Sequence, residues 1–293
     1  MSFFKASATI SGLTLTSRVF GFVRDVLLAR FLGASATADA FFVALRLPNM
    51  LRQLFAEGAF NVAFVPYLGT KMAETSQQEA QRFAGVVFAW VLTVVLALTV
   101  LGMVFMENVV LGVAPGFADA PQTLALATDL SRIAFPYLML VVATSFMGGV
   151  LNTLHRFAAF AAAPILLNLT FIALLLFFPD GIFFGQQPAT TAALALPVGG
   201  VLQVVFMMVV LKRSGFKIRL TWPKRHPDLK PLAKKIAPTF VGVGAQQINT
   251  FLTTVLASLL MPGSISYLFY ADRLSQLPLA LIGIAMATAL LPT

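Results

Sequence analysis

Long uninterrupted apolar runs are the feature that most constrains how this chain can fold. Six stretches combine bilayer-spanning length with few charges, and roughly 20 apolar residues are what a helix needs to cross the hydrocarbon of a membrane. The runs are continuous rather than alternating with a period of two, which favours helices over the strands of a membrane barrel. They are Phe83–Met106, Ile133–Leu154, Phe157–Phe178, Thr190–Leu211, Pro238–Leu260 and Ala271–Pro292.

Two further segments at the N-terminus, Lys5–Leu32 and Ala38–Leu68, are apolar but carry charges. Counting them as spans, we predict an all-α polytopic membrane protein with about eight transmembrane helices. The composition agrees, because 59% of the residues are hydrophobic and 11% are charged, too few polar groups to cover a water-facing surface. A soluble enzyme and a disordered chain are thereby excluded, and the absence of cysteine excludes a disulfide scaffold. Arg18 and Arg24 interrupt the first segment, which argues against a cleaved signal peptide.

Basic residues gather in the connections that would face the cytoplasm. The segment 212–235 holds nine of the twenty Lys and Arg residues, whereas the connections on the opposite side are acidic or neutral apart from Arg132. This alternation predicts a cytoplasmic N-terminus by the positive-inside rule. The nine residues are Lys212, Arg213, Lys217, Arg219, Lys224, Arg225, Lys230, Lys234 and Lys235.

The basic segment 212–235 allows a second interpretation besides topology. Each basic residue near the surface of an anionic membrane contributes about 1 kcal/mol of attraction, so anionic lipid is an expected partner. Nucleic acid is not expected, because no aromatic interleaving or recognition helix accompanies the charge.

Charges inside the first apolar segment call for partners or water. An arginine at mid-membrane costs at least about 2.5–3.5 kcal/mol, so Arg18 and Arg24 are expected to face a hydrated cavity or a counter-ion. Arg18 and Asp25 share a helix face, and a structural ion pair between them is the alternative. Arg30 lies near the helix end, where its side chain can snorkel to the surface.

The second charged segment carries a polar stripe on an otherwise apolar helix. Such a stripe predicts the lining of a transporter cavity, and a buried face of interhelical hydrogen bonds is the alternative. Pro48 predicts a bend or an unwound turn within it. The stripe comprises Asn49, Gln53, Glu57 and Asn61, four residues apart, and Asp39, Arg46 and Gln53, seven apart, with Arg52 beside it.

Several kinds of chemistry are missing from the sequence. It contains no nucleotide-binding loop, no cluster of metal ligands and no nucleophile elbow. We therefore expect no enzyme activity, no cofactor and no metal site. Guanidinium groups match phosphate oxygens bidentately and never lose their charge, so the residues indicate a carrier for an anionic, phosphate-bearing substrate.

Several motifs, in order along nearly the whole chain, resemble the MurJ/MviN family of lipid II flippases, which belong to the MOP transporter superfamily. The first helix contributes Ser17-Arg18-Val19-Phe20-Gly21-Phe22-Val23-Arg24-Asp25. Others are Ala38-Asp39-Ala40-Phe41-Phe42, Leu47-Pro48-Asn49, Phe55-Ala56-Glu57-Gly58, Ala114-Pro115-Gly116-Phe117, Phe135-Pro136-Tyr137, Gly149-Val150-Leu151-Asn152 and Tyr270-Ala271-Asp272-Arg273.

The resemblance implies a transporter of the bacterial inner membrane. Its substrate would be lipid II, the undecaprenyl-pyrophosphate-linked peptidoglycan precursor, moved across the membrane by alternating access through a cationic cavity. The pyrophosphate would be held by Arg18, Arg24, Arg52 and Arg273. Asp25, Asp39 and Glu57 would act in gating or salt bridges, with Asn49 and Gln53 lining the cavity.

Length sets the expected domain organisation. Family members have about fourteen helices in two lobes, so this chain would hold an N-terminal lobe of six helices (1–211), the basic cytoplasmic loop (212–235) and the start of the second lobe (236–293), with helices nine to fourteen missing. A monomer is expected. Three alternatives remain open: a flippase for another polyprenyl-linked saccharide, a drug exporter, and a membrane scaffold that transports nothing.

Overall fold

The computed structural model describes residues 3–53, 59–179, 181, 187–219 and 221–275, and all regular structure in these ranges is helical. A last, unlabelled helical stretch covers 264–275 and is called the terminal helix below. The labelled helices are α1 (Phe3–Leu32), α2 (Ala36–Arg52), α3 (Ala59–Glu74), α4 (Gln77–Val104), α5 (Met106–Val113), the 3-10 turn η2 (Pro115–Asp119), α6 (Pro121–Ala134), α7 (Tyr137–Thr153), α8 (Phe157–Phe177), α9 (Pro188–Arg213) and α10 (Leu229–Ser258).

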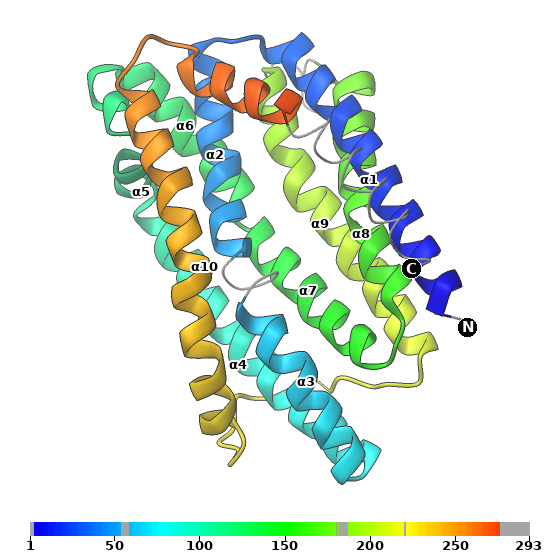
Figure 1. Ribbon diagram of the computed structural model, residues 1–293. Helices are drawn as coiled ribbons and strands as arrows, with labels where there is room; N and C mark the ends of the chain where they lie inside the picture. Colours follow the sequence, from blue (N-terminus) through cyan, green and yellow to red (C-terminus); the bar gives the residue numbers. More distant parts are fainter. Residues whose placement is uncertain (1–2, 54–58, 180, 182–186, 220, 276–293) are drawn as a thin grey trace.

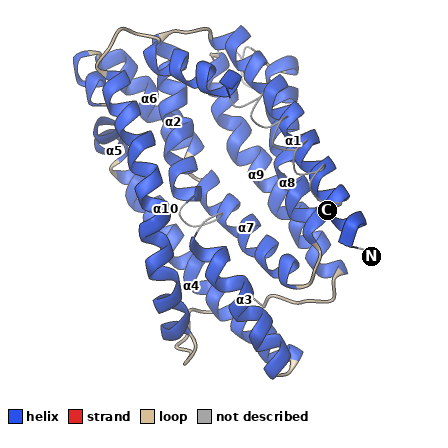
Figure 2. Cartoon of the chain, viewed as in Figure 1, coloured by secondary structure: helices blue, strands red, loops and turns tan. Residues whose placement is uncertain are grey.

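The long helices lie side by side as an elongated bundle (Figures 1 and 2). Helix α8 packs against both α1 and α9, α7 packs on α9, α2 packs on α6, and α10 packs on α3. The bundle has two ends. The Asp39 end is where α1 connects to α2 and α10 to the terminal helix, and the Asp228 end is where the loop 214–228 connects α9 to α10 (Figure 1).

Four helical segments of the described chain are long and apolar enough to span a membrane: α4, Pro121–Thr153, α8 and α9. They differ in burial. In Pro121–Thr153, 78% of the most apolar window is buried, against 22% in α4. The α6–α7 segment therefore forms the centre of the bundle, and α4 presents apolar side chains outward, as a lipid-facing helix must.

Close approach between the central helices depends on glycine. A Cβ at Gly200 of α9 would lie 2.8 Å from Cδ2 of Tyr137, and one at Gly199 would lie 2.7 Å from Cδ1 of Leu167. Small residues at helix contacts let membrane helices pack closely without a hydrophobic driving force. These glycines hold α9 against α7 and α8.

The predicted span Ala38–Leu68 falls on two helices of the described chain. Helix α2 covers Ala36–Arg52 and α3 covers Ala59–Glu74, and Glu57 of the polar stripe lies outside the described residues. Pro48 lies within α2, which runs through it without the predicted unwound turn.

Four predicted spans fall on the four membrane-length segments, with shifted ends: Phe83–Met106, Ile133–Leu154, Phe157–Phe178 and Thr190–Leu211. The run Ile133–Leu154 is interrupted at Pro136, where α6 gives way to α7. Helix α10 begins at Leu229, so the last lysines of the basic segment lie on a helix rather than in a loop. Of the predicted span Ala271–Pro292, the part beyond residue 275 lies outside the described residues.

Candidate functional site

A buried carboxylate lies between two arginines from distant parts of the chain. Asp25 of α1 accepts from Nη2 of Arg24 at 2.7 Å, and its other oxygen lies 3.4 Å from Nε of Arg273 on the terminal helix. The side chain of Asp25 is 9% exposed. We call Arg24, Asp25 and Arg273 the arginine–aspartate triad. It carries one net positive charge, with the Asp25 carboxylate buried and the Arg273 side chain 39% exposed, an arrangement that an anionic ligand would stabilise.

Helix α8 supports the triad from the other side. Nη1 of Arg24 donates to Oδ1 of Asn168 at 3.0 Å, and the guanidinium carbon lies 5.5 Å from the ring centre of Phe171. The sequence predicted no role in the site for either Asn168 or Phe171. Asn168 and Phe171 are three residues apart, so they share one face of α8. The sequence alone does not tell which helix packs against α1, so this spacing could not assign the two residues to the site.

Charges of both signs influence Arg273. The guanidinium groups of Arg24 and Arg52 repel it, and the carboxylates of Asp25 and Asp272 attract it. Nε of Arg52 also donates to Oδ1 of Asn49 at 3.2 Å, so these two predicted residues lie together at the end of α2.

Arg18 lies apart from the other predicted arginines. Its side chain is exposed on α1. The alternative of an Arg18–Asp25 ion pair is wrong, since the ion pairs of Asp25 in the described chain are with Arg24 and Arg273. Arg18 is two helical turns away from Asp25 along α1, whereas Arg24 is adjacent to Asp25 in the sequence.

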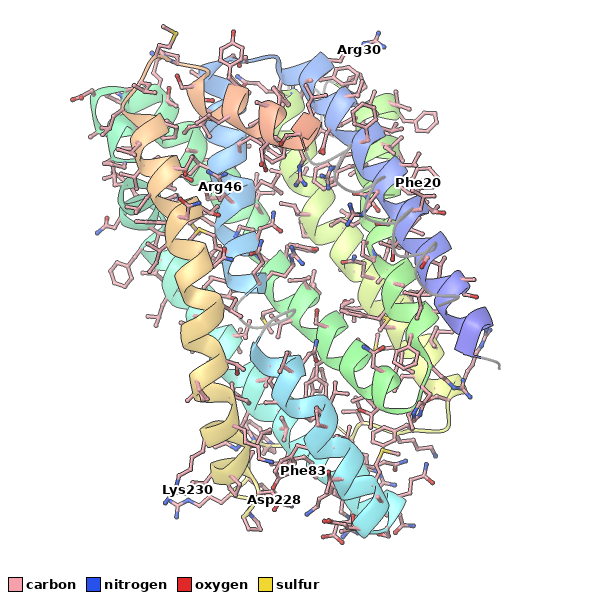
Figure 3. The ribbon with its side chains drawn as sticks, viewed as in Figure 1. Phe20, Arg30, Arg46, Phe83, Asp228 and Lys230 are labelled. Carbon is pink, nitrogen blue, oxygen red and sulfur yellow. The ribbon has the colours of Figure 1, made fainter. Side chains whose placement is uncertain are left out.

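Polar contacts at regular intervals join α2 to α10. Gln53 accepts from Gln247, and Arg46 donates to Thr254. Figure 3 shows Arg46 between the two helices. The seven residues from Arg46 to Gln53 match the seven from Thr254 to Gln247, which run in the opposite direction along α10. We call these contacts, together with those of Asp39, the α2–α10 polar ladder.

Asp39 ends the ladder by capping the terminal helix. Its carboxylate accepts from the backbone N–H of Gly263 at 2.6 Å, from that of Ser266 at 2.8 Å and from the Ser266 hydroxyl at 2.6 Å. Asp39 is 4% exposed. The partners in these contacts are neutral donors at a helix N-terminus, where a negative charge is stabilising. No salt bridge of Asp39 is described.

The remaining predicted gating residue, Glu57, lies outside the described residues. The spacing of Asp39, Arg46 and Gln53 on α2 predicted a cavity lining, with a face of interhelical hydrogen bonds as the alternative, and the contacts of Arg46 and Gln53 agree with that alternative. The partners were not predicted because the matching residues of α10, such as Thr254, are individually unremarkable. The signal that could have found them is the same period of seven in both helices.

Comparison with known proteins decides the family. The family described as "Lipid II flippase MurJ" matches residues 28–293. This chain belongs to the MurJ family. The "Probable lipid II flippase MurJ" of Rhizobium tropici is 41% identical over 296 residues, covering 100% of this chain and 55% of that protein.

Solved structures agree with the family assignment. The structure described as "Lipid II flippase MurJ, inward closed conformation" superposes with a TM-score of 0.71 at 29% identity, covering 92% of this chain and 54% of that one. An inward-facing MATE-family multidrug transporter of the MOP superfamily superposes with a TM-score of 0.68 at 16% identity, covering 95% and 64%, which shows a shared fold. The MurJ-family chain described here spans about half the length of the relatives it matches.

A second charged cluster in this MurJ-family chain lies at the Asp228 end (Figure 3). Asp228 forms an ion pair with Lys71, accepts from the Tyr67 hydroxyl at 3.2 Å and lies 3.5 Å from Nδ1 of His226. The hydrogen bond from Lys71 is the main reason why the pKa of the Asp228 carboxyl is lowered below its usual range. These contacts fasten the loop 214–228 to α3.

The same loop is also attached along α4. Nε1 of Trp90 donates to the carbonyl of Lys224 at 3.0 Å, and a Cβ at Gly85 would lie 2.5 Å from the carbonyl oxygen of Arg219. Attached in this way, the loop holds its basic side chains at a fixed place beside the N-terminal turns of α4.

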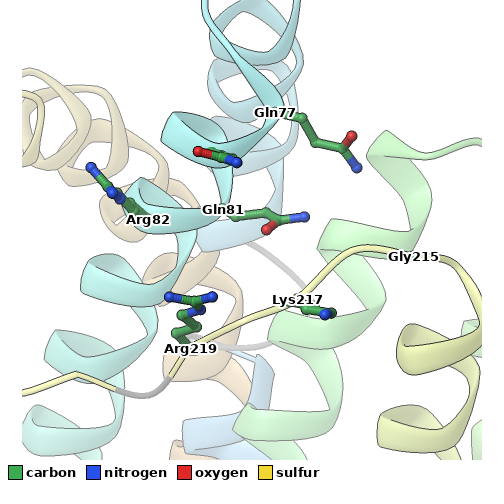
Figure 4. A pocket seen from close by; sticks show the side chains of 7 residues that line it. Gln77, Gln81, Arg82, Gly215, Lys217 and Arg219 are labelled. Carbon is green, nitrogen blue, oxygen red and sulfur yellow. The ribbon is translucent and has the colours of Figure 1, made fainter.

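Two adjoining hollows of about 350 and 540 Å³ lie between this loop and α4. Figure 4 shows the smaller one, with Arg82, Lys217 and Arg219 turned toward it. Arg82 and Arg219 also line the larger hollow, to which Lys224 and Arg225 contribute. Glu79 contributes the one carboxylate in the lining of the larger hollow, where basic side chains outnumber it. Both hollows therefore have a positive potential, which favours anions.

Proposed function

We propose that the full-length protein moves lipid II from the cytoplasmic to the periplasmic leaflet of the bacterial inner membrane by alternating access. The observation that carries the proposal is the arginine–aspartate triad, in which Arg24 and Arg273 meet at Asp25 inside the bundle. The curated names of the relatives support lipid II as the substrate. The pyrophosphate linkage supplies the anion that two guanidinium groups are suited to bind.

Asp25 gives the triad a way to release its substrate. Without substrate, the carboxylate accepts hydrogen bonds from Arg24 and forms an ion pair with Arg273. A diphosphate competes with Asp25 for the same donors, so binding and release exchange one set of charge-assisted hydrogen bonds for another. Because only a difference in affinity between two conformations can shift their equilibrium, movement of Arg273 relative to Arg24 would provide that difference.

The α2–α10 polar ladder is the proposed gate. The ladder joins segment 1–211, the proposed first lobe, to segment 236–293, the proposed start of the second. Polar side chains such as Arg46 and Gln53 reach across to α10, and water can replace these hydrogen bonds when the two helices separate. Opening at the Asp39 end would require the carboxylate of Asp39 to leave the terminal helix.

The Asp228 end is the proposed cytoplasmic end. The positive-inside rule and the basic residues of loop 214–228 support this orientation, which places the N-terminus in the cytoplasm and the Asp39 end toward the periplasm. A topology reporter fused after Trp222 should give the signal of a cytoplasmic location, and the signal of an exported location would overturn this orientation. Anionic lipid headgroups are the proposed occupants of the two hollows, with Arg82 and Arg219 as shared contacts.

Replacing the arginines in the full-length protein tests the proposed function. In cells depleted of their own lipid II flippase, the wild-type protein should restore growth and transfer of lipid II to the periplasmic leaflet. Arg24→Ala and Arg273→Ala should insert normally and fail to restore either. Arg132→Ala is the matched control, since Arg132 is 48% exposed and its partner Asp129 lies 3.7 Å away on the same helix.

Distinct outcomes separate the alternatives. Restored lipid II transfer by both arginine variants would overturn the assignment of the site. A wild-type protein that fails to transfer lipid II in these cells would favour another polyprenyl-linked saccharide, a drug or a scaffold role instead.

A further inference from the structure

We propose that Asn168 is a positioning residue that fixes the plane of the Arg24 guanidinium for the diphosphate of the substrate. This inference rests on the proposed function and adds to it a residue outside the arginines and carboxylates considered so far. Asn168 lies on α8, a helix that contributes no charge to the triad.

The orientation of the Asn168 amide is determined by its two partners. Its Nδ2 donates to the backbone carbonyl of Ser17 at 3.0 Å, which leaves Oδ1 turned toward Nη1 of Arg24 at 3.0 Å. Swapping the two amide atoms would place a donor against a donor and an acceptor against an acceptor. Because Asn168 is only 6% exposed, water cannot readily replace either bond.

The Asn168 amide lies beside Gly21, between α1 and α8. A Cβ at Gly21 would lie 3.4 Å from Nδ2 of Asn168, an ordinary contact distance, so the amide packs close to the backbone of α1. The amide thus joins the first turn of the motif, at Ser17, to its last turn, at Arg24.

The contacts of Arg24 leave part of its guanidinium for a ligand. Nε and Nη2 both donate to one oxygen of Asp25, at 2.9 and 2.7 Å, Nη1 donates to Asn168, and Phe171 lies 5.5 Å from the guanidinium carbon. A guanidinium carries five N–H groups, so these three bonds leave two for phosphate oxygens. With several neighbours fixing its plane, Arg24 loses little rotational freedom when it binds.

An amide suits this role better than a carboxylate. Asn168 orients Arg24 without adding negative charge, whereas an aspartate there would place a second carboxylate on the same guanidinium. Asn168→Leu keeps the side-chain volume similar and removes both hydrogen bonds. Loss of a charge-assisted hydrogen bond that orients the ligand-binding group should weaken diphosphate binding about tenfold.

The test is a double-mutant cycle on the purified full-length protein, with undecaprenyl pyrophosphate as the probe. We expect Asn168→Leu to weaken binding about tenfold in the wild-type background and to change it less than twofold in an Arg24→Ala background. Gln203→Leu is the matched control. Gln203 is likewise a buried amide, 3% exposed, that donates to a helix backbone carbonyl, of Ala163 at 2.9 Å, with no described contact to the triad.

Each outcome has a defined meaning. Equal losses of affinity in the two backgrounds, or an equal loss in Gln203→Leu, would show that Asn168 merely joins helices and would overturn the inference. If the wild type binds the probe, Arg24→Ala weakens binding and Asn168→Leu binds normally, the positioning role fails and the proposed function stands. If the wild type does not bind the probe, both fail together.

Discussion

Two carboxylates of this chain each lie between two basic side chains, and they differ in what surrounds them. Asp25 is held by Arg24 and Arg273 from opposite ends of the sequence, within the bundle. Asp228 is held by Lys71 and His226 at the surface loop, where its side chain is 22% exposed. Similar charge arrangements therefore serve different purposes at the two places.

The difference follows from the dielectric environment. Near water, an ion pair contributes little and is screened by salt, so the Asp228 cluster fastens a loop locally. In the apolar bundle, each charge is costly unless it is paired. Asp25 therefore neutralises part of the positive charge of Arg24 and Arg273, and we propose that a substrate anion replaces it. The next four experiments compare the two regions, beginning with the largest expected effect.

Asp25→Asn should have the largest effect. It removes the negative charge between two guanidinium groups in a poorly hydrated site, and breaking a buried ion pair costs about 3–5 kcal/mol. Thermal unfolding of the full-length protein in detergent should show a large loss of stability together with lost lipid II transfer. Asp129→Asn, at a side chain 72% exposed, is the control. Equal effects of the two variants would contradict the contrast between buried and exposed pairs.

Asp39→Ala should rank second, because it removes the helix cap that closes the ladder. Loss of an N-cap and its hydrogen bonds costs about 2 kcal/mol. We expect a cysteine placed at Ser264 to become more reactive toward a membrane-impermeant thiol reagent. Ser266→Ala, which removes just the hydroxyl contact, should produce a smaller increase. Unchanged reactivity in Asp39→Ala would argue against a closed gate at this end.

Gly85→Ala should displace the loop rather than the bundle. The added Cβ would meet the carbonyl oxygen of Arg219 at 2.5 Å, and relief of such overpacking costs about 1 kcal/mol. Faster proteolysis within 214–228 is the expected result. Gly112→Ala, where nothing lies within 4 Å, should cleave at the wild-type rate. Wild-type cleavage of Gly85→Ala would show that the loop is not attached at this point.

The smallest effect is expected for Asp228→Asn, and it should depend on pH. Because the pKa of Asp228 is lowered in the folded protein, chiefly by the hydrogen bond from Lys71, its contribution to stability is present above the unfolded pKa of about 3.9. That contribution is lost as the pH falls through the lower folded pKa. Loop proteolysis at neutral pH should be slightly faster in the variant, in line with about 0.5 kcal/mol.

The wild type and Asp228→Asn should then converge under acidic conditions, measured with an acid-active protease. A difference that grows toward low pH would contradict the assigned ion pair.

The class of fold followed from the sequence because apolar length is a local property. A run such as Phe157–Phe178 must satisfy its backbone groups internally in lipid, which leaves a helix as the solution, and α8 occupies nearly those residues. The motif around Arg24 and Asp25 predicted an anion site, and that stays a prediction.

Tertiary structure decided which residues meet. Asp25 has neighbouring charges at several sequence distances, and periodicity favoured Arg18, yet the fold brings Arg273 from the terminal helix to it. Asn168 is one amide in an apolar helix, and its hydrogen bond to the Ser17 carbonyl turns Oδ1 toward Arg24. Pairing between charges depends on distances of a few ångströms between helices far apart in sequence, and these are set by how the whole bundle packs.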